Sequence, residues 1–127
     1  MKYTDADIKK YDEMIARFLG WFQEEEGLKE TWYVIQDSAK YVAYSTYNNY
    51  PHNGLPFHRS WNDIVPVVEK VAAMVTKIEI KFYAKNDRII SYVSILDETK
   101  YYQSGEGEPL EQLYTAIVEF LKYIYHE

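Results

Sequence analysis

The sequence predicts an α+β protein in which three helices cover an antiparallel sheet of about four strands, in the order αββαββα. Three segments repeat apolar residues at spacings of three and four, which is the period of an amphipathic helix. Two pairs of short segments, rich in β-branched and aromatic residues, are joined by brief turns, as in antiparallel hairpins. With 127 residues, we expect one domain over residues 1–127.

The first helix is predicted to begin after Thr4 and to stop at Gly20. Thr4 and Asp7 have the spacing of a capping box, in which each side chain accepts a hydrogen bond from the other residue's backbone. Residues 24–26 are all Glu, and a longer helix would place their charges at its negative end. Gly20 favours a left-handed ending, with Trp21 folding back on the last turn. The apolar stripe consists of Ile8, Tyr11, Ile15, Phe18 and Phe22.

Residues 31–36 and 40–46 are rich in β-branched and aromatic residues, and only residues 37–39 separate them. They are predicted to form a hairpin. Residues 47–56 show no apolar period and collect Asn, Pro and Gly, which favour turns. We interpret them as a surface loop.

The middle helix is predicted to begin at Ser60, where Ser60 and Asp63 repeat the capping pattern. Pro66 removes one hydrogen bond from the first turns, so a kink or a loose turn is expected there. The apolar stripe expected to face the core consists of Trp61, Ile64, Val65, Val68, Val71, Ala72 and Val75.

The second hairpin is predicted over residues 77–84 and 88–96, with Asn86 and Asp87 in the turn. The first strand alternates apolar and polar residues, whereas the second is apolar on both parities, as expected of a central strand. Residues 99–103 are compatible with a short edge strand. Pro109 suits the first position of the last helix, whose stripe consists of Leu110, Leu113, Ile117, Leu121 and Ile124.

Composition excludes several classes of function. The net charge of −6 argues against binding to a nucleic-acid backbone, and no apolar run reaches the length of a membrane span. The chain has no Cys, so it has neither disulfides nor thiolate ligands, and its first residues lead into polar sequence. We therefore expect an acidic, cytoplasmic protein that needs no cofactor.

His58 is the main candidate for chemistry, because it precedes a helix close to Ser60 and Asp63. A histidine at a loop-to-helix junction more often serves the structure, and we expect that role here. His52, His58 and Asp63 do not match a familiar metal-ligand spacing, so no metal site is predicted. The motifs of common hydrolases, nucleotide-binding loops and dehydrogenases do not occur.

Aromatic residues are the main candidates for binding, since fourteen tyrosines are many for core packing alone. Tyrosine combines a large contact area with a polar tip, which suits a binding surface, but it can also cover a thin sheet with its hydroxyl in water. Both interpretations stay open. Trp61 and Trp32 are expected in the core. The tyrosines in or beside predicted loops and strand ends are Tyr44, Tyr47, Tyr50, Tyr101 and Tyr102.

Residues 55–71 read LPFHRSWNDIVPVVEKV and resemble an FHxSWxxxxPVVEKI motif of small, mostly uncharacterised proteins from Bacteroidetes genomes and their phages. Residues 15–21 resemble the end of the first helix of that group, and residues 116–123 resemble its last helix. The resemblance implies a phage-type α/β sandwich and brings no assigned catalytic activity.

We therefore expect a noncatalytic, tyrosine-rich interaction module of phage or prophage type that binds another protein. The alternative is a small-ligand or nucleotide-binding protein whose loop tyrosines stack on the ligand. The candidate binding residues are Tyr44, Tyr47, Tyr50, His52 and His58. The sequence leaves the oligomeric state open.

Overall fold

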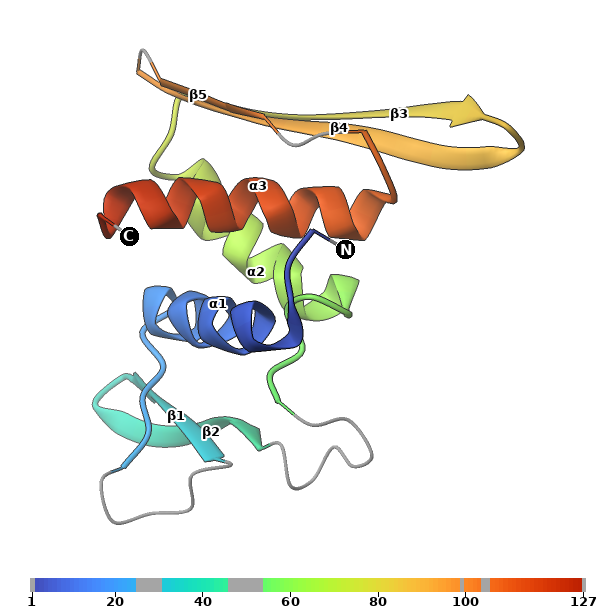
Figure 1. Ribbon diagram of the computed structural model, residues 1–127. Coiled ribbons are helices and arrows are strands. Elements are labelled where there is room, and N and C mark those ends of the chain that lie inside the picture. Colours follow the sequence, from blue (N-terminus) through green and yellow to red (C-terminus); the bar gives the residue numbers. More distant parts are fainter. Residues whose placement is uncertain (1, 25–30, 46–53, 99, 104–105, 127) are drawn as a thin grey trace. The chain divides into compact units, whose positions relative to one another are not determined.

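The structure, a computed structural model, describes residues 2–24, 31–45, 54–98, 100–103 and 106–126 (Figure 1). It confirms the α+β class and the predicted order of helices and strand pairs, and it adds the short edge strand expected near residues 99–103. The elements are α1 (Asp5–Phe18), β1 (Thr31–Gln36), β2 (Ala39–Ser45), α2 (Trp61–Ala72), β3 (Lys77–Lys85), β4 (Arg88–Asp97), β5 (Lys100–Gln103) and α3 (Pro109–Ile124).

The strands in the described ranges form two antiparallel sheets instead of the one sheet expected from the sequence. β1 pairs with β2, and β3, β4 and β5 form a second sheet with β4 in the middle. The chain divides into two compact units: Tyr3–Pro56 contains the first sheet, while Phe57–Glu127 contains the second together with Met1–Lys2. The single domain expected over residues 1–127 stays a prediction. None of the helices in the described ranges is both long and apolar enough to cross a membrane.

In the unit Tyr3–Pro56, both predicted ends of α1 are confirmed. The Asp7 amide donates to Thr4 Oγ1 at 3.1 Å and the Thr4 amide donates to Asp7 Oδ2 at 3.2 Å, which completes the capping box. At the other end the Trp21 amide donates to the Ala16 carbonyl at 2.9 Å, and Gly20 has φ +86°. Together with the Gly20 amide bond to a carbonyl in the last turn, this is a Schellman ending.

The hairpin of β1 and β2 turns through Asp37 and Ser38, whose φ angles of 51° and 67° are those of a two-residue I′ turn. Phe22, downstream of α1, exchanges backbone hydrogen bonds of 2.9 and 2.8 Å with Tyr33 of β1. The segment after α1 is thereby paired to the hairpin. Trp32 is 5% exposed, which confirms its expected burial.

In the unit that begins at Phe57, β3 and β4 pair in continuous register and turn through Asn86 and Asp87 with positive φ. Residues opposite each other in an antiparallel pair point to the same face. We call the face that carries Ser91, Val93 and Ile95 of β4 the inner face, and the opposite one the outer face. These three side chains are 8% exposed or less, as expected for the centre of a covered sheet.

Helix α3 covers the inner face and also contacts α2 (Figure 1). Tyr102 of β5 is opposite Ile95, and its ring lies 5.6 Å from the rings of both Phe120 and Tyr123 of α3. The side chains of α3 are buried nearly all round, as expected of a helix covered on more than one side.

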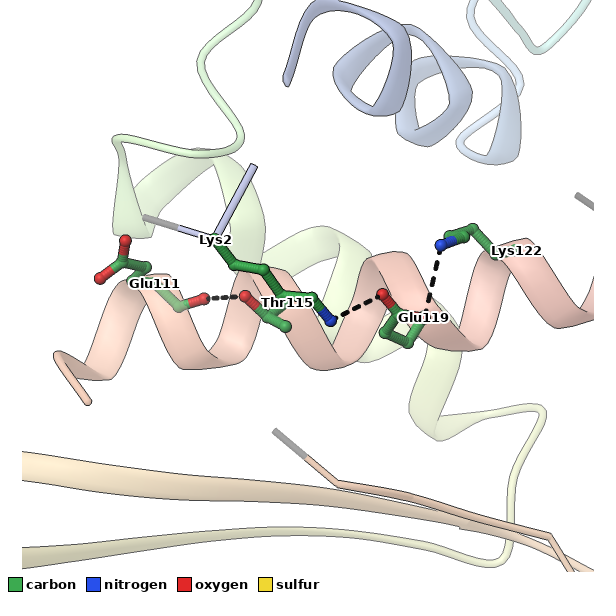
Figure 2. A network of polar contacts seen from close by, with 5 residues as sticks. All are labelled: Lys2, Glu111, Thr115, Glu119 and Lys122. Carbon is green, nitrogen blue, oxygen red and sulfur yellow. Dashed lines mark hydrogen bonds and ion pairs between the residues drawn. The ribbon is translucent and has the colours of Figure 1, made fainter. Parts of the chain in front are cut away.

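Lys2 belongs to this unit, and its side chain pairs with α3 (Figure 2). Lys2 Nζ lies 3.3 Å from Glu119 Oε1, and Lys122 Nζ lies 3.6 Å from Glu119 Oε2. One turn earlier, the Thr115 hydroxyl donates to the Glu111 carbonyl at 2.8 Å. Exposed ion pairs of this kind contribute about 1 kcal/mol or less, so they position the terminus more than they stabilise the fold.

Two expectations about α2 are wrong. Ser60 is the N-cap residue as predicted, but its side chain makes no capping hydrogen bond. Trp61 and Val65 are each 43% exposed, and Ala72 is exposed too, although the sequence placed all three on the stripe that faces the core. The buried stripe is Ile64, Val67 and Val71, and at about 100° per residue Trp61 lies well to one side of it. The helix continues through Pro66.

We predict that Gly20→Ala lowers the free energy of unfolding by about 1 kcal/mol, because an L side chain is strained at positive φ. Among the described residues, no atom lies within 4 Å of the new Cβ, so a clash adds nothing to this loss. Gly20→Asn is the matched variant and should lose less, because Asn tolerates the left-handed region. Urea denaturation measures both, and equal losses would contradict the conformational explanation.

We also predict that Tyr102→Phe raises the free energy of unfolding by about 1 kcal/mol. The Tyr102 hydroxyl oxygen is buried and has no hydrogen-bond partner within the part of the chain that the structure describes. Burial without a partner costs about 1–3 kcal/mol, whereas the ring contacts with α3 survive the substitution. A lower free energy of unfolding in urea denaturation would show instead that the Tyr102 hydroxyl forms a hydrogen bond.

Candidate functional site

The candidate site is the turn end of the β3–β4 hairpin, which extends past the N-terminal end of α3 (Figure 1). β4 has ten residues and spans about 33 Å at the rise of an extended strand. α3 has sixteen residues and spans about 24 Å. The helix is therefore too short to cover the whole inner face.

The uncovered end of the inner face is apolar. Phe82 is 57% exposed and Ile89 is 65% exposed, and Ala84 is the cross-strand neighbour of Ile89. We call these three residues the tip patch. Because they share one face, they form one contiguous apolar surface, unlike the scattered single residues that are normal on a protein surface.

Ser91 marks the boundary between the covered and uncovered parts. It lies opposite Phe82 and is 0% exposed. Its backbone pairs with Gly107, with the Ser91 amide donating to the Gly107 carbonyl at 2.8 Å. The chain enters α3 shortly after Gly107. Among the residues that the structure describes, cover of the inner face therefore ends at Ser91 and does not extend towards the turn.

The outer face of the same end carries a polar cluster. The Tyr83 hydroxyl donates to Glu106 Oε2 at 2.8 Å, and Lys85 Nζ donates to Glu106 Oε1 at 2.6 Å. The rings of Tyr83 and Tyr92 stack at 6.1 Å. Ile90, opposite Tyr83, is only 8% exposed. The cluster thus joins the hairpin to the segment before α3.

The electrostatics of the cluster follow from this geometry. Loss of water around the hydroxyl and its hydrogen bond to the Glu106 carboxylate raise the pKa of Tyr83 to about 12. Lys85 and then Tyr83 lower the pKa of Glu106, and Glu106 raises the pKa of Lys85. The cluster is therefore in its hydrogen-bonded, ion-paired form over the neutral range.

Of the binding residues predicted from the sequence, the structure places Tyr44 and His58, which belong to different units. Tyr44 is half-buried on β2, opposite Trp32. His58 lies in the turn before α2, and its ring meets the ring of Tyr114 edge-on at 6.2 Å. Tyr47, Tyr50 and His52 lie outside the described residues, as does most of the predicted loop.

The packing of His58 against Tyr114 is what the expected structural role requires, and that role stays a prediction. The conceivable metal set of His52, His58 and Asp63 includes a residue that the structure does not describe. Within the described ranges, no group of three or more histidine or acidic side chains is placed to hold a metal ion.

Sequence reasoning missed the tip patch, because it assigned Phe82 and Ala84 to the apolar side of a covered strand. The missed signal is a mismatch of lengths: the hairpin strands predicted from the sequence are longer than the last helix can cover. That mismatch places the uncovered surface near the Asn86–Asp87 turn.

Comparisons of the chain with protein-family models, with curated proteins and with solved structures gave no match.

We predict that the Tyr83 hydroxyl titrates at about 12 and that Glu106→Gln moves this pKa down towards 10. The substitution removes the negative charge that opposes formation of the phenolate. The measurement is the pH dependence of the carbon-13 signals of labelled tyrosine rings, with Tyr83→Phe identifying the signal.

These shifted pKa values make the free energy of unfolding depend on pH. Because the folded pKa of Tyr83 is above that of the unfolded chain, its contribution is fully present below pH 10 and is lost as the pH rises towards about 12. The lowered pKa of Glu106 acts at the other end, where its contribution is lost as the pH falls below 4.5. An unchanged Tyr83 titration in Glu106→Gln would contradict the cluster.

Proposed function

We propose that this chain is a noncatalytic protein-interaction module that binds another protein through the tip patch. The observation that carries the proposal is the exposure of Phe82 and Ile89, which lie diagonally across the strand pair on a face whose continuation forms the core of the unit. Interfaces are enriched in such aromatic and apolar anchors, with polar groups at their rim.

Two further features support a binding role. The strands beneath the patch are paired in continuous register up to the turn, and the Tyr83–Glu106–Lys85 cluster braces their outer face. A braced surface loses little conformational entropy when it binds. The patch therefore combines apolar area with a rigid support.

The resemblance of residues 55–71 to Bacteroidetes and phage proteins supports a phage or prophage origin and action in the cytoplasm. The alternative, a small-ligand or nucleotide-binding protein, depends on Tyr47 and Tyr50. Because both lie outside the described residues, no observation favours it over protein binding.

The test is a double variant, Phe82→Thr with Ile89→Thr, which removes the apolar groups and keeps residues that suit a strand. We expect stability to change by about 1 kcal/mol or less, because both side chains are largely exposed. Recovery of the partner from a lysate of the native host should fall about tenfold or more, as expected when interface anchors are truncated.

The matched control is Ile35→Thr with Val42→Thr on the β1–β2 hairpin, where these side chains are 56% and 60% exposed. This variant should recover the partner as well as the unmodified chain does. If the control loses the partner and the tip variant keeps it, the binding surface lies on β1–β2 and the assignment to the tip patch is wrong. A large loss of stability in the tip variant would mean that Phe82 and Ile89 serve the fold.

A further inference from the structure

β3 forms one edge of its sheet, and within the described residues no strand pairs with its side away from β4. The strand has nine residues, from Lys77 to Lys85. Its unpaired backbone amides and carbonyls are a template for another strand. The side chains of β3 decide which strand can pair there and in which register.

The two faces of β3 differ sharply. The outer face carries charges of alternating sign in Lys77, Glu79 and Lys81, and the inner face carries apolar groups. Lys77 Nζ lies 3.0 Å and Lys81 Nζ lies 3.4 Å from the Glu79 carboxylate, and both lysines lower its pKa. The inner-face residues of β3 are Ile78, Ile80, Phe82 and Ala84.

A second copy of the same strand can pair only in certain registers. Symmetric antiparallel pairing places a two-fold axis perpendicular to the sheet, and this axis keeps each face on its own side. Opposed residues must therefore belong to the same face, so the axis passes midway between one residue and its own copy, which lie opposite each other.

Axes on the outer-face residues bring like charges together. An axis on Glu79 opposes the two Glu79 carboxylates and sets Lys77 against Lys81 of the second copy. An axis on Lys81 opposes the two Lys81 side chains and sets Lys77 against Lys85. Like charges directly opposite each other destabilise a strand pair, so both registers are disfavoured.

An axis on Ile80 satisfies both faces. Glu79 of each copy is then opposite Lys81 of the other, Ile78 is opposite Phe82, and the two Ile80 side chains meet at the axis. An axis on Phe82 sets Glu79 opposite Lys85, which already pairs with Glu106 at 2.6 Å, and it leaves Lys81 opposite the uncharged Tyr83. The register on Ile80 instead pairs Glu79 with Lys81 in both directions and leaves the Lys85–Glu106 ion pair as it is.

We infer that two copies of this chain associate by antiparallel pairing of their β3 edges, centred on Ile80. The pairing joins the two three-stranded sheets into one, with an apolar row on the inner face and reciprocal Glu79–Lys81 ion pairs on the outer face. This inference goes beyond the proposed function, because it concerns the backbone edge of β3 and a second copy of the chain. Of the tip patch, the paired strands use Phe82 alone.

The first test is sedimentation equilibrium of the full chain over a wide concentration range. The unmodified protein should approach twice its mass of 15.1 kDa at high concentration. Glu79→Lys alone and Lys81→Glu alone should each weaken association about tenfold or more, because each puts like charges opposite each other twice per dimer. Lys81→Glu distinguishes the two registers. With the axis on Ile80 it places two carboxylates opposite each other, whereas with the axis on Phe82 residue 81 is opposite the uncharged Tyr83.

The second test mixes the two single variants in equal amounts. In a mixed pair, positions 79 and 81 carry opposite charges across the interface, so the mixture should associate although neither variant does so alone. Each single variant also loses an ion pair within its own strand, and mixing cannot restore that pair. Recovery in the mixture therefore isolates the contact between copies.

The absence of cysteine from the chain allows a third measurement. Ile80→Cys should form a disulfide between copies on mild oxidation, because residues at the axis are directly opposite, within the Cα separation that a disulfide requires. Ile78→Cys is the matched control and should not cross-link at a comparable rate, since its copy is about 13 Å away along the strands.

Three results would overturn the inference: an unmodified protein that stays monomeric at every concentration, single variants that associate as well as it does, or faster cross-linking at position 78 than at position 80. Circular dichroism of each variant checks that it is folded. None of these substitutions lies in the tip patch. Loss of self-association and loss of capture of a different protein are therefore separate outcomes, and either proposal can be wrong while the other holds.

Discussion

The packing of α3 on the inner face of the β3–β4–β5 sheet is the interaction on which the rest of this unit depends. It buries the centre of β4, it contacts the ring of Tyr102 through Phe120, and it fixes where cover of the inner face ends. Ser91, paired with Gly107 at the start of the helical segment, is the last covered position. Both β3 and β4 continue past Ser91 towards the turn. Their inner-face side chains remain apolar there, and because α3 does not cover them they form the exposed tip patch. Core and candidate site are thus one continuous face that a shorter helix only partly covers.

The open edge of β3 needs protection from unspecific pairing, and its charge pattern provides it. Lysines are common on exposed edges because a neighbouring strand would bury or oppose them. Here Glu79 stands between Lys77 and Lys81 and pairs with both. Registers of a second β3 centred on Glu79 or Lys81 therefore oppose like charges, whereas the register centred on Ile80 opposes Glu79 to Lys81. The same residues therefore oppose unspecific aggregation and allow two copies of β3 to pair in a defined register.

Local signals in the sequence predicted the elements well, and non-local packing accounts for what they missed. The ends of α1 follow from Thr4, Asp7 and Gly20, because capping and left-handed endings depend on a few neighbouring residues. The central place of β4 follows from apolar residues on both parities. The division into two sheets, however, depends on contacts between distant segments. The exposure of Trp61 reflects a stripe whose direction around α2 is set by its packing partners.

The candidate site was hidden from sequence reasoning for a related reason. Alternation in β3 shows which side chains share a face, but it does not show how far along the strand a helix covers that face. Phe82 and Ile80 are two positions apart on the same side, yet only Phe82 is largely exposed. The outer-face cluster then gives this exposed end its rigidity, because Glu106 bonds to both Tyr83 and Lys85 from outside the hairpin. An apolar surface held in this way has already lost much of the freedom that binding would remove, so more of its burial energy is available for association.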